Sequence, residues 1–382
     1  MKTALLTRRR IVAASLAALV VAAVQASPSA AAALLHPSQA EKPIGALDYV
    51  RGQVALVRKG EEMPSPGPGD SLYDGDLVRT DSSSTATIAM DPSSGFSGSI
   101  VINPGTTFYL KRSVKEDMPH TGLDLMAGSL SAKVSKISGK PGLDVSTGLS
   151  TFGVRGTQFE IALSVNATLF AVCEEGSVAV TTGDAESPLP AGQAIQQAEE
   201  GRPVPISFEA SSIGELRGKW LDKEGALFRR APLKVLALFE RRYSEHARAI
   251  LGETRSLVLD PVFRKWIQED RTGAAPDPLD PQVLRDKKRL MPKLVSLAKH
   301  IAVFERVYWR LNDMVDIVRN GEFSKQEIRK GLAVAKFVAD FDRDRKDLER
   351  AIFVYHRALA LYGERSPDSE DLLTTLGAGG LE

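Results

Sequence analysis

Histidine and cysteine are the most common zinc ligands, and in this sequence their spacing does not suit a metal site. Two histidines four residues apart on one helix, or paired cysteines, provide the usual zinc ligands. Cys173 is the only cysteine, so no disulfide forms within the chain, and its apolar neighbours predict a buried thiol rather than a reactive one. No two of the five histidines have the helical spacing; they are His36, His120, His246, His300 and His356. We expect no metal site and no cofactor.

Acidic residues gather in one short stretch, at Asp70, Asp74, Asp76 and Asp81. Calcium prefers several carboxylate oxygens that converge on one point, and these four side chains would supply them. Aspartate beside glycine is also ordinary turn chemistry. We prefer the turn interpretation and keep calcium as the alternative, which a calcium titration of thermal stability distinguishes.

Motifs for enzymatic chemistry are absent from the sequence. No serine lies in the Gly-x-Ser-x-Gly pattern that exposes a nucleophile on a strand-to-helix turn, and neither glycine pattern for binding nucleotide phosphates occurs. We therefore predict a protein that is not an enzyme.

One charged residue stands out, because Arg155 lies between Gly153 and Gly156. Paired glycines among Thr, Val and Phe predict a tight corner in a β-structure. The planar guanidinium would either hold backbone carbonyls at that corner, which we prefer, or bind a ligand carboxylate. The signature residues of the corner are Gly153, Val154, Arg155, Gly156, Thr157 and Phe159. Their predicted role is structural, and no ligand-binding residue is assigned.

The elements around this corner are short strands. Between residues 44 and 208, apolar runs of four to eight residues alternate with Gly, Pro, Asp, Ser or Asn at nearly every joint. Such spacing predicts an all-β domain, built as a sandwich, barrel or solenoid, rather than an alternating α/β fold. Asn166-Ala167 is expected to be a hairpin tip.

The corner and its surroundings resemble the FecR domain family, which consists of extracytoplasmic modules. The resemblance spans about residues 47–195 and departs from the family at Gly148, where proline is frequent. Its motifs outside the corner are Gly75 to Thr80, Pro104 to Thr106, Gly128 to Leu130, Asp144 to Thr147, Glu175 to Val178 and Ala191 to Gln193. The resemblance implies a non-catalytic role in sensing or transmitting signals across the cell envelope.

The hydrophobic period changes from 2 to 3.6 near residue 209, which predicts helices. We expect a helical segment over 209–271, with Pro232 and Pro261 at first helical positions, then a linker over 272–282. A long antiparallel helical hairpin follows over 283–365, and 366–382 is a loose tail. Ser324 and Glu327 have the spacing of a capping box that opens the second helix. Arg345 interrupts its apolar face and marks a partner-facing or solvent-lined position.

The amino terminus has the three parts of an export signal: a basic start, an uncharged apolar run, and small residues before a cleavage point. We predict a signal peptide over 1–26 and a flexible tether over 27–43. General secretion is the favoured route, and Arg8 to Arg10 leave the twin-arginine route open. About 14 apolar residues fall short of the ~20 needed for a membrane span. We expect no membrane span after cleavage.

Charge and resemblance together set the functional expectation. Residues 27–208 carry a net charge of −7 and residues 209–382 carry +4, which argues against a nucleic-acid partner. We predict a periplasmic module that senses signals by binding an envelope or outer-membrane protein. FecR regulators usually place an anti-sigma segment and a membrane helix before this domain; an export signal stands there instead, so we expect no direct sigma-factor circuit. The alternative is an envelope-structural or cell-wall assembly protein that self-associates through its helices.

Overall fold

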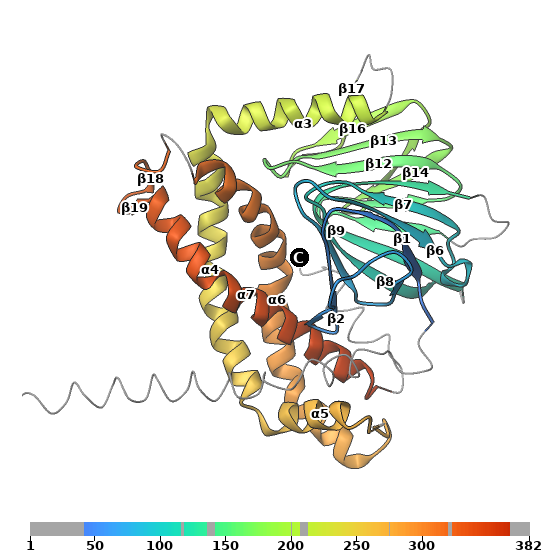
Figure 1. The fold of residues 1–382 in the computed structure, drawn as a ribbon, viewed down its shortest axis with the longest axis vertical. Coiled ribbons are helices and arrows are strands. Elements are labelled where there is room, and N and C mark those ends of the chain that lie inside the picture. The colour runs from blue at the N-terminus through green and yellow to red at the C-terminus, as the bar shows by residue number, and fades with distance from the viewer. Residues whose placement is uncertain are drawn as a thin grey trace, which may run out of the picture. The chain divides into compact units, whose positions relative to one another are not determined.

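The structure is a computed structural model, and it describes residues 42–115, 118–135, 142–199, 201–206, 213–274, 276–319 and 323–366. Residue 42 opens a compact unit that holds both the strands and the helices (Figure 1). The predicted signal peptide, most of the predicted tether and the predicted tail lie outside the described residues.

The first half of this unit is a sandwich of two sheets. Sheet 1 contains, in order, β4 (Ser71–Leu72), β1 (Gly45–Arg51), β6 (Thr85–Met90), β7 (Gly98–Ile102), β9 (Met118–Val134), β12 (Gln158–Leu163), β13 (Leu169–Glu175), β16 (Gln193–Gln197) and β17 (Val204–Ile206). Sheet 2 contains β3 (Glu61–Glu62), β2 (Val54–Arg58), β5 (Leu77–Thr80), β8 (Thr107–Lys115), β9 again, β10 (Leu143–Ser146), β11 (Thr151–Val154), β14 (Ser177–Thr182) and β15 (Ala185–Pro190). One apolar core, to which both sheets contribute, lies between them. The predicted all-β domain is confirmed.

Strand β9 belongs to both sheets. Residues 118–127 pair with β8, and residues 121–124 also pair with β10, whereas residues 128–134 pair with β7 and β12. Gly128 stands at the change of sheet with φ of +82°, and an added Cβ there would lie 2.5 Å from the carbonyl oxygen of Gly105. Glycine is required because any side chain would collide with the neighbouring turn.

The turns form where the turn-favouring residues of the sequence occur. Strands β12 and β13 pair as a hairpin whose tip is Asn166-Ala167, as predicted. Ala167 has φ of +60°, yet its side chain is buried. A short 3-10 helix, η1 (Pro92–Ser94), begins after Asp91, whose carboxylate accepts a hydrogen bond from the Ser93 amide.

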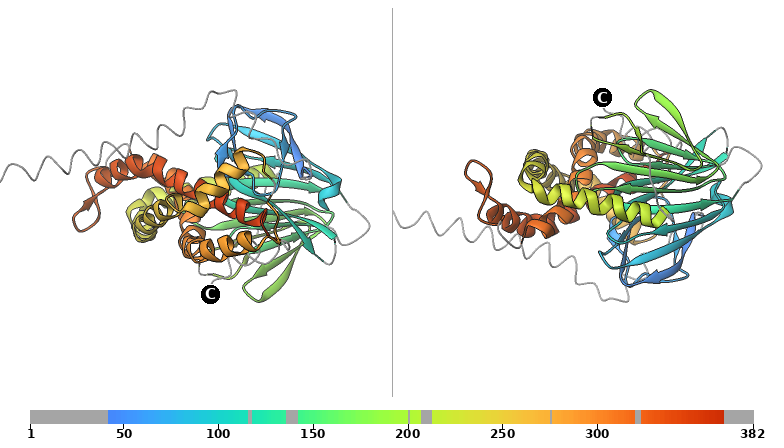
Figure 2. Two further views of the ribbon diagram at one scale, coloured as in Figure 1. Left: turned by 90° about the horizontal axis from the view of Figure 1, so that it is seen from below. Right: turned by 90° about the horizontal axis from the view of Figure 1, so that it is seen from above.

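Five described helices form the second half: α3 (Ile213–Arg230), α4 (Pro232–Val258), α5 (Pro261–Arg271), α6 (Pro281–Val318) and α7 (Val334–Gly363). Pro232 and Pro261 take the predicted first positions of α4 and α5. Asp260 and Asp280 cap α5 and α6 by accepting hydrogen bonds from the amides two residues on. Helix α6 leads to a small hairpin and α7 returns along it (Figures 1 and 2). The predicted helical region with a long hairpin is confirmed.

The predicted capping box is wrong. Glu327 lies in strand β18 (Glu327–Arg329), which pairs with β19 (Leu332–Ala333) around Gly331 at φ of +80°. Helix α7 therefore begins later, at Val334, and its first amides donate to the backbone carbonyls of Gln326 and Ser324. Backbone carbonyls of the turn before β18 satisfy the helix end that the side chains were expected to cap.

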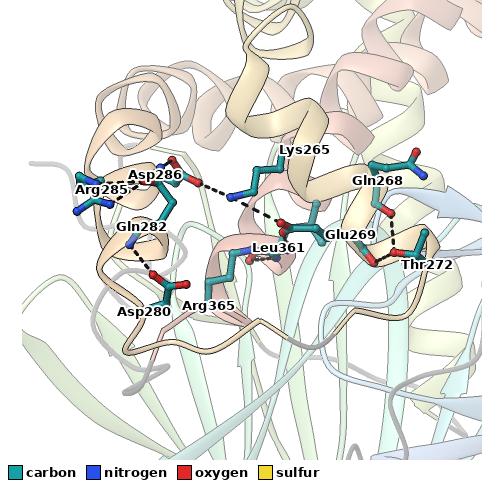
Figure 3. A network of polar contacts seen from close by, with 10 residues as sticks. All are labelled: Lys265, Gln268, Glu269, Thr272, Asp280, Gln282, Arg285, Asp286, Leu361 and Arg365. Atoms are coloured by element: carbon teal, nitrogen blue, oxygen red, sulfur yellow. Dashed lines mark hydrogen bonds and ion pairs between the residues drawn. The ribbon is translucent and has the colours of Figure 1, made fainter.

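A polar network joins the ends of α5, α6 and α7 (Figure 3). Arg365 donates to Glu269 Oε2 at 2.9 Å and to the carbonyl of Leu361, and its guanidinium lies over the Trp266 ring. Lys265 donates to Asp286 Oδ2 at 3.1 Å. These bonds fix the short helix α5 against its longer neighbours.

The helices pack on the outer faces of both sheets. Trp220 of α3 contacts Phe170 of β13, with ring centroids 5.3 Å apart, on sheet 1. On sheet 2, Leu77, Tyr109 and Met126 join the core of α6 and α7. Strand β13 is therefore covered on both sides, which explains its continuous apolar run and the complete burial of Cys173. None of the described helices is long and apolar enough to cross a membrane.

Candidate functional site

The signature residues lie together at one corner of the sandwich. Gly153 and Val154 end β11, Arg155 and Gly156 form the turn, and Phe159 follows in β12. Val154, Thr157 and Phe159 are buried, with exposed fractions of 1%, 2% and 2%. These three side chains anchor the turn to the core.

The two glycines serve different purposes. Gly156 has φ of +61°, which favours glycine. Gly153 has ordinary extended backbone and pairs with Asp144 of β10, whose Oδ1 would lie 3.6 Å from an added Cβ. That distance is an ordinary van der Waals contact, so an alanine would also fit at position 153. The predicted tight corner exists, but only one of its glycines requires a left-handed conformation.

The Arg155 guanidinium does not hold the backbone carbonyls of the corner, which was the role we preferred for it. Its side chain is exposed, and it makes no hydrogen bond or ion pair with any residue that the structure describes. The expected bonds to backbone carbonyls at the corner are therefore not formed with described residues. The turn is instead closed by backbone, because the Val134 amide donates to the Thr157 carbonyl at 2.8 Å. The guanidinium is available to a binding partner.

A histidine and a carboxylate lie beside this arginine. His120 Nε2 is 3.0 Å from Asp144 Oδ2. Gly142 lies between the His120 and Arg155 side chains: an added Cβ there would be 3.4 Å from His120 Cε1 and 3.8 Å from Arg155 Cγ. We call His120, Asp144, Gly153, Arg155 and Gly156 the signature corner. In the described part of the chain, no hydroxyl or thiol hydrogen-bonds to His120, so the corner lacks the nucleophile of a hydrolytic triad.

The four clustered aspartates take separate turn positions, as the preferred interpretation predicted. Asp70 accepts from the Gly67 amide, Asp74 from the Arg112 amide, and Asp81 from Ser83 and Ser84. Asp76 is fully buried and accepts two bonds from Arg58, each 2.9 Å long. Within the described ranges, no three His, Cys, Asp or Glu side chains lie together as metal ligands would.

A buried polar contact joins the sandwich to the helices. Tyr109 of β8 donates to Glu305 Oε1 of α6 at 2.5 Å, and His356 Nε2 of α7 lies 3.0 Å from the same oxygen. The Tyr109 and His356 rings are 4.6 Å apart. Burial, reinforced by the charge of Glu305, raises the pKa of Tyr109 well above its ordinary value, so the phenol keeps its proton and donates. We call these three residues the junction triad.

The comparisons with known proteins concern the sandwich. Residues 76–179 match the family model described as FecR protein. The sandwich contains a FecR domain. The predicted resemblance is thereby confirmed, over a shorter range than residues 47–195. The comparison with curated proteins gives no match.

Among solved structures, the chain is similar to two crystal structures of a candidate anti-sigma factor from Parabacteroides distasonis ATCC 8503. Sequence identity is 14% and 15%, with a TM-score of 0.31 for both. The alignments cover 36% and 37% of this chain, and 62% and 64% of those chains. The chain thus spans less than two thirds of the length of these structures.

The helices also hold the tip of the β12–β13 hairpin. Glu224 of α3 is 6% exposed and accepts hydrogen bonds from Asn166 Nδ2 at 2.8 Å and Thr168 Oγ1 at 2.8 Å. Sequence patterns missed this contact because the partners are 56 and 58 residues apart. The one sequence feature that indicates this contact is the charge of Glu224 on an otherwise apolar face of α3. The tip of the FecR domain is thereby fixed to α3.

Arg345, which we singled out on the apolar face of α7, is solvent-lined. Its side chain is 40% exposed, and its Nε lies 3.5 Å from Glu349 Oε1 one turn on. Glu349 also accepts from Tyr308 at 2.9 Å and lies 3.5 Å from Arg79 of the FecR domain. Arg345 thus belongs to a second, more exposed polar contact between sandwich and helices.

Two histidines that the sequence separates by 54 residues meet between α4 and α6. The Nδ1 atoms of His246 and His300 are 3.0 Å apart, and His300 Nε2 lies 3.8 Å from Glu253. The search for helical spacing missed this pair because its members lie on different helices. Burial lowers the pKa of His246; the charge of Glu245 opposes this change and His300 adds to it.

This pair predicts a pH dependence of stability. Because the folded protein lowers the pKa of His246 below 6.5, the unfolded chain binds the proton more readily. The free energy of unfolding should therefore fall as the pH decreases from 6.5 towards the folded-state pKa. Urea titrations at pH 5.5 and 7.5 measure this difference, which should be smaller in His246→Gln. An equal difference in the variant would contradict the assignment.

Proposed function

We propose that this protein is an exported signal-transducing module whose FecR domain binds a partner protein at the signature corner. The observation that carries the proposal is the exposed guanidinium of Arg155, which has no partner among the described residues, on a turn anchored by buried side chains. An arginine on an anchored turn offers a planar donor fork to a carboxylate on another protein. The helices serve as a scaffold on the outer faces of the sandwich.

The amino-terminal sequence supports a periplasmic location. A basic start followed by an uncharged run from Ile11 to Val24 is typical of an export signal, and general secretion is the favoured route. The partner would then be an envelope or outer-membrane protein. The proposed role is binding rather than catalysis, since neither the signature corner nor the junction triad presents a nucleophile.

Cross-linked capture from envelope fractions tests the partner proposal. Arg155→Ala should leave the free energy of unfolding within about 0.5 kcal/mol of the wild type, because the side chain is exposed and unpaired. It should also lower the yield of one captured protein about tenfold, which corresponds to about 1.4 kcal/mol of binding energy. Arg51→Ala is the matched control, since Arg51 is an exposed arginine of the same sandwich. Undiminished capture by Arg155→Ala would overturn the proposal, and a large loss of stability would return Arg155 to a structural role.

A second function, assembly by self-association through the helices, is favoured by exposed leucines. Leu227 and Leu238 are each 44% exposed, and Leu279 is 71% exposed. Self-association would require that such side chains form one contiguous apolar patch, because patches and not single side chains mark interfaces between proteins. Sedimentation velocity and binding to purified peptidoglycan distinguish the two functions, because a monomer that ignores peptidoglycan excludes the second.

A further inference from the structure

Arg310 on α6 is a buried arginine that forms no hydrogen bond or ion pair with the residues the structure describes. Its side chain is 6% exposed, its Nε is inaccessible and makes no hydrogen bond, and no ion pair joins it to any residue within the described ranges. A buried charge without hydrogen bonds is costly, because the guanidinium loses its hydration and here gains only the longer-range attraction of Glu199 and Asp313. A folded protein tolerates this cost where a ligand supplies the missing acceptors.

A second arginine lies one turn earlier on the same face of α6. Arg306 Nε is also buried without a hydrogen bond, and its terminal nitrogen is 3.8 Å from Asp124 of β9. Its guanidinium lies directly against Gly148 in the turn between β10 and β11, where an added Cβ would overlap it. Like charges four residues apart destabilise a helix, so this pair adds to the cost of burying Arg310.

The surrounding charges leave this region positive. Arg242 of α4 and Arg306 both oppose the charge of Arg310, whereas Glu199 and Asp313 favour it. Glu199 is already engaged in an ion pair with Arg242, which leaves Asp313 of the same helix as the remaining acid. Asp124 is shared between Arg306 and Lys111. Burial lowers the pKa of Arg310 to about 10, so the guanidinium remains charged at neutral pH.

We propose that Arg310 and Arg306, with Arg242 beside them, bind a small oxyanion between helices α4 and α6 and the Gly148 turn of the FecR domain. The planar fork of arginine matches phosphate and carboxylate oxygens in pairs. The depth of Arg310 restricts the ligand to a small anion. This site lies outside the signature corner, and its occupancy is independent of partner binding there.

Thermal unfolding in inorganic phosphate and in malonate, each against chloride at equal ionic strength, tests the site. Either anion should raise the melting temperature of the wild type by about 2 °C or more at saturation, because it binds only the folded protein. A larger rise in phosphate identifies a phosphoryl ligand, and a larger rise in malonate identifies a carboxylate. Isothermal titration calorimetry should give one site per chain.

Variants make the test specific. Arg310→Gln should abolish the rise while matching or exceeding the wild-type melting temperature in chloride, because it removes an unpaired charge. Arg306→Gln should weaken the rise and provides the test if Arg310→Gln does not fold. Arg350→Gln, at an exposed position of α7, is the control and should respond as the wild type does. A wild type that ignores both anions, or an Arg310→Gln variant that responds fully, would overturn the proposal.

Discussion

Replacing Gly60 with alanine should lower the free energy of unfolding by about 3 kcal/mol. Gly60 forms the turn between β2 and β3 and has φ of +76°. An added Cβ would overlap the carbonyl oxygen of Phe353 on α7 and would lie 2.8 Å from its carbonyl carbon. A helix backbone cannot yield as a flexible side chain can, so either the turn or the helix must move. Urea denaturation followed by circular dichroism measures the loss.

Gly69→Ala is the matched control for this variant. Gly69 has φ of +96°, but no atom lies within 4 Å of an added Cβ. Alanine there should cost only the left-handed backbone strain, about 1 kcal/mol. The difference between the two variants isolates the contact between the FecR domain and α7. Equal losses would show that α7 does not rest on the β2–β3 turn in solution.

Replacing Glu305 with alanine should cost a similar amount, about 3 kcal/mol. The carboxylate is 4% exposed and is the shared acceptor of the junction triad. Without it, the Tyr109 hydroxyl is buried with no acceptor, and His356 loses the oxygen that faces it. Denaturant titration should show a lower midpoint. Glu245→Ala, at an exposed position of α4, should stay within about 0.5 kcal/mol of the wild type.

A double-mutant cycle shows whether this cost arises at the junction triad. In a Tyr109→Phe background the phenol no longer needs an acceptor, so Glu305→Ala should cost about 1 kcal/mol less than it does in the wild type. Strictly additive losses would mean that Tyr109 and Glu305 do not interact. Such a result would mean that this contact contributes no interaction energy between the FecR domain and α6.

Local patterns predicted most of the sandwich, because strand spacing and turn chemistry are local properties. The hairpin tip at Asn166-Ala167 and the first residues of α4 and α5 were recognisable from two or three neighbouring residues. The sequence predicted short strands throughout, whereas β9 is one bent strand of 17 residues that passes through Gly128. Glycine permits both outcomes, and only the neighbouring strands decide between them.

Contacts between distant segments could not be predicted in this way. Tyr109 and Glu305 are 196 residues apart, and the two histidines of α4 and α6 are 54 residues apart. The capping box failed for a related reason, since the backbone carbonyls of Ser324 and Gln326, just before β18, accept the hydrogen bonds of the first amides of α7. The exposure of the Arg155 guanidinium was also unforeseeable, because it depends on which strands surround the turn.

Strand β9, which crosses from one sheet to the other, has a consequence for how the sandwich unfolds. Cutting the chain anywhere within Met118–Val134 would remove hydrogen-bonded neighbours from both layers at once. Neither layer is therefore an autonomous folding unit, and the FecR domain should melt in a single cooperative step. Amide protons along the whole of β9 should then exchange with deuterium at one common, slow rate.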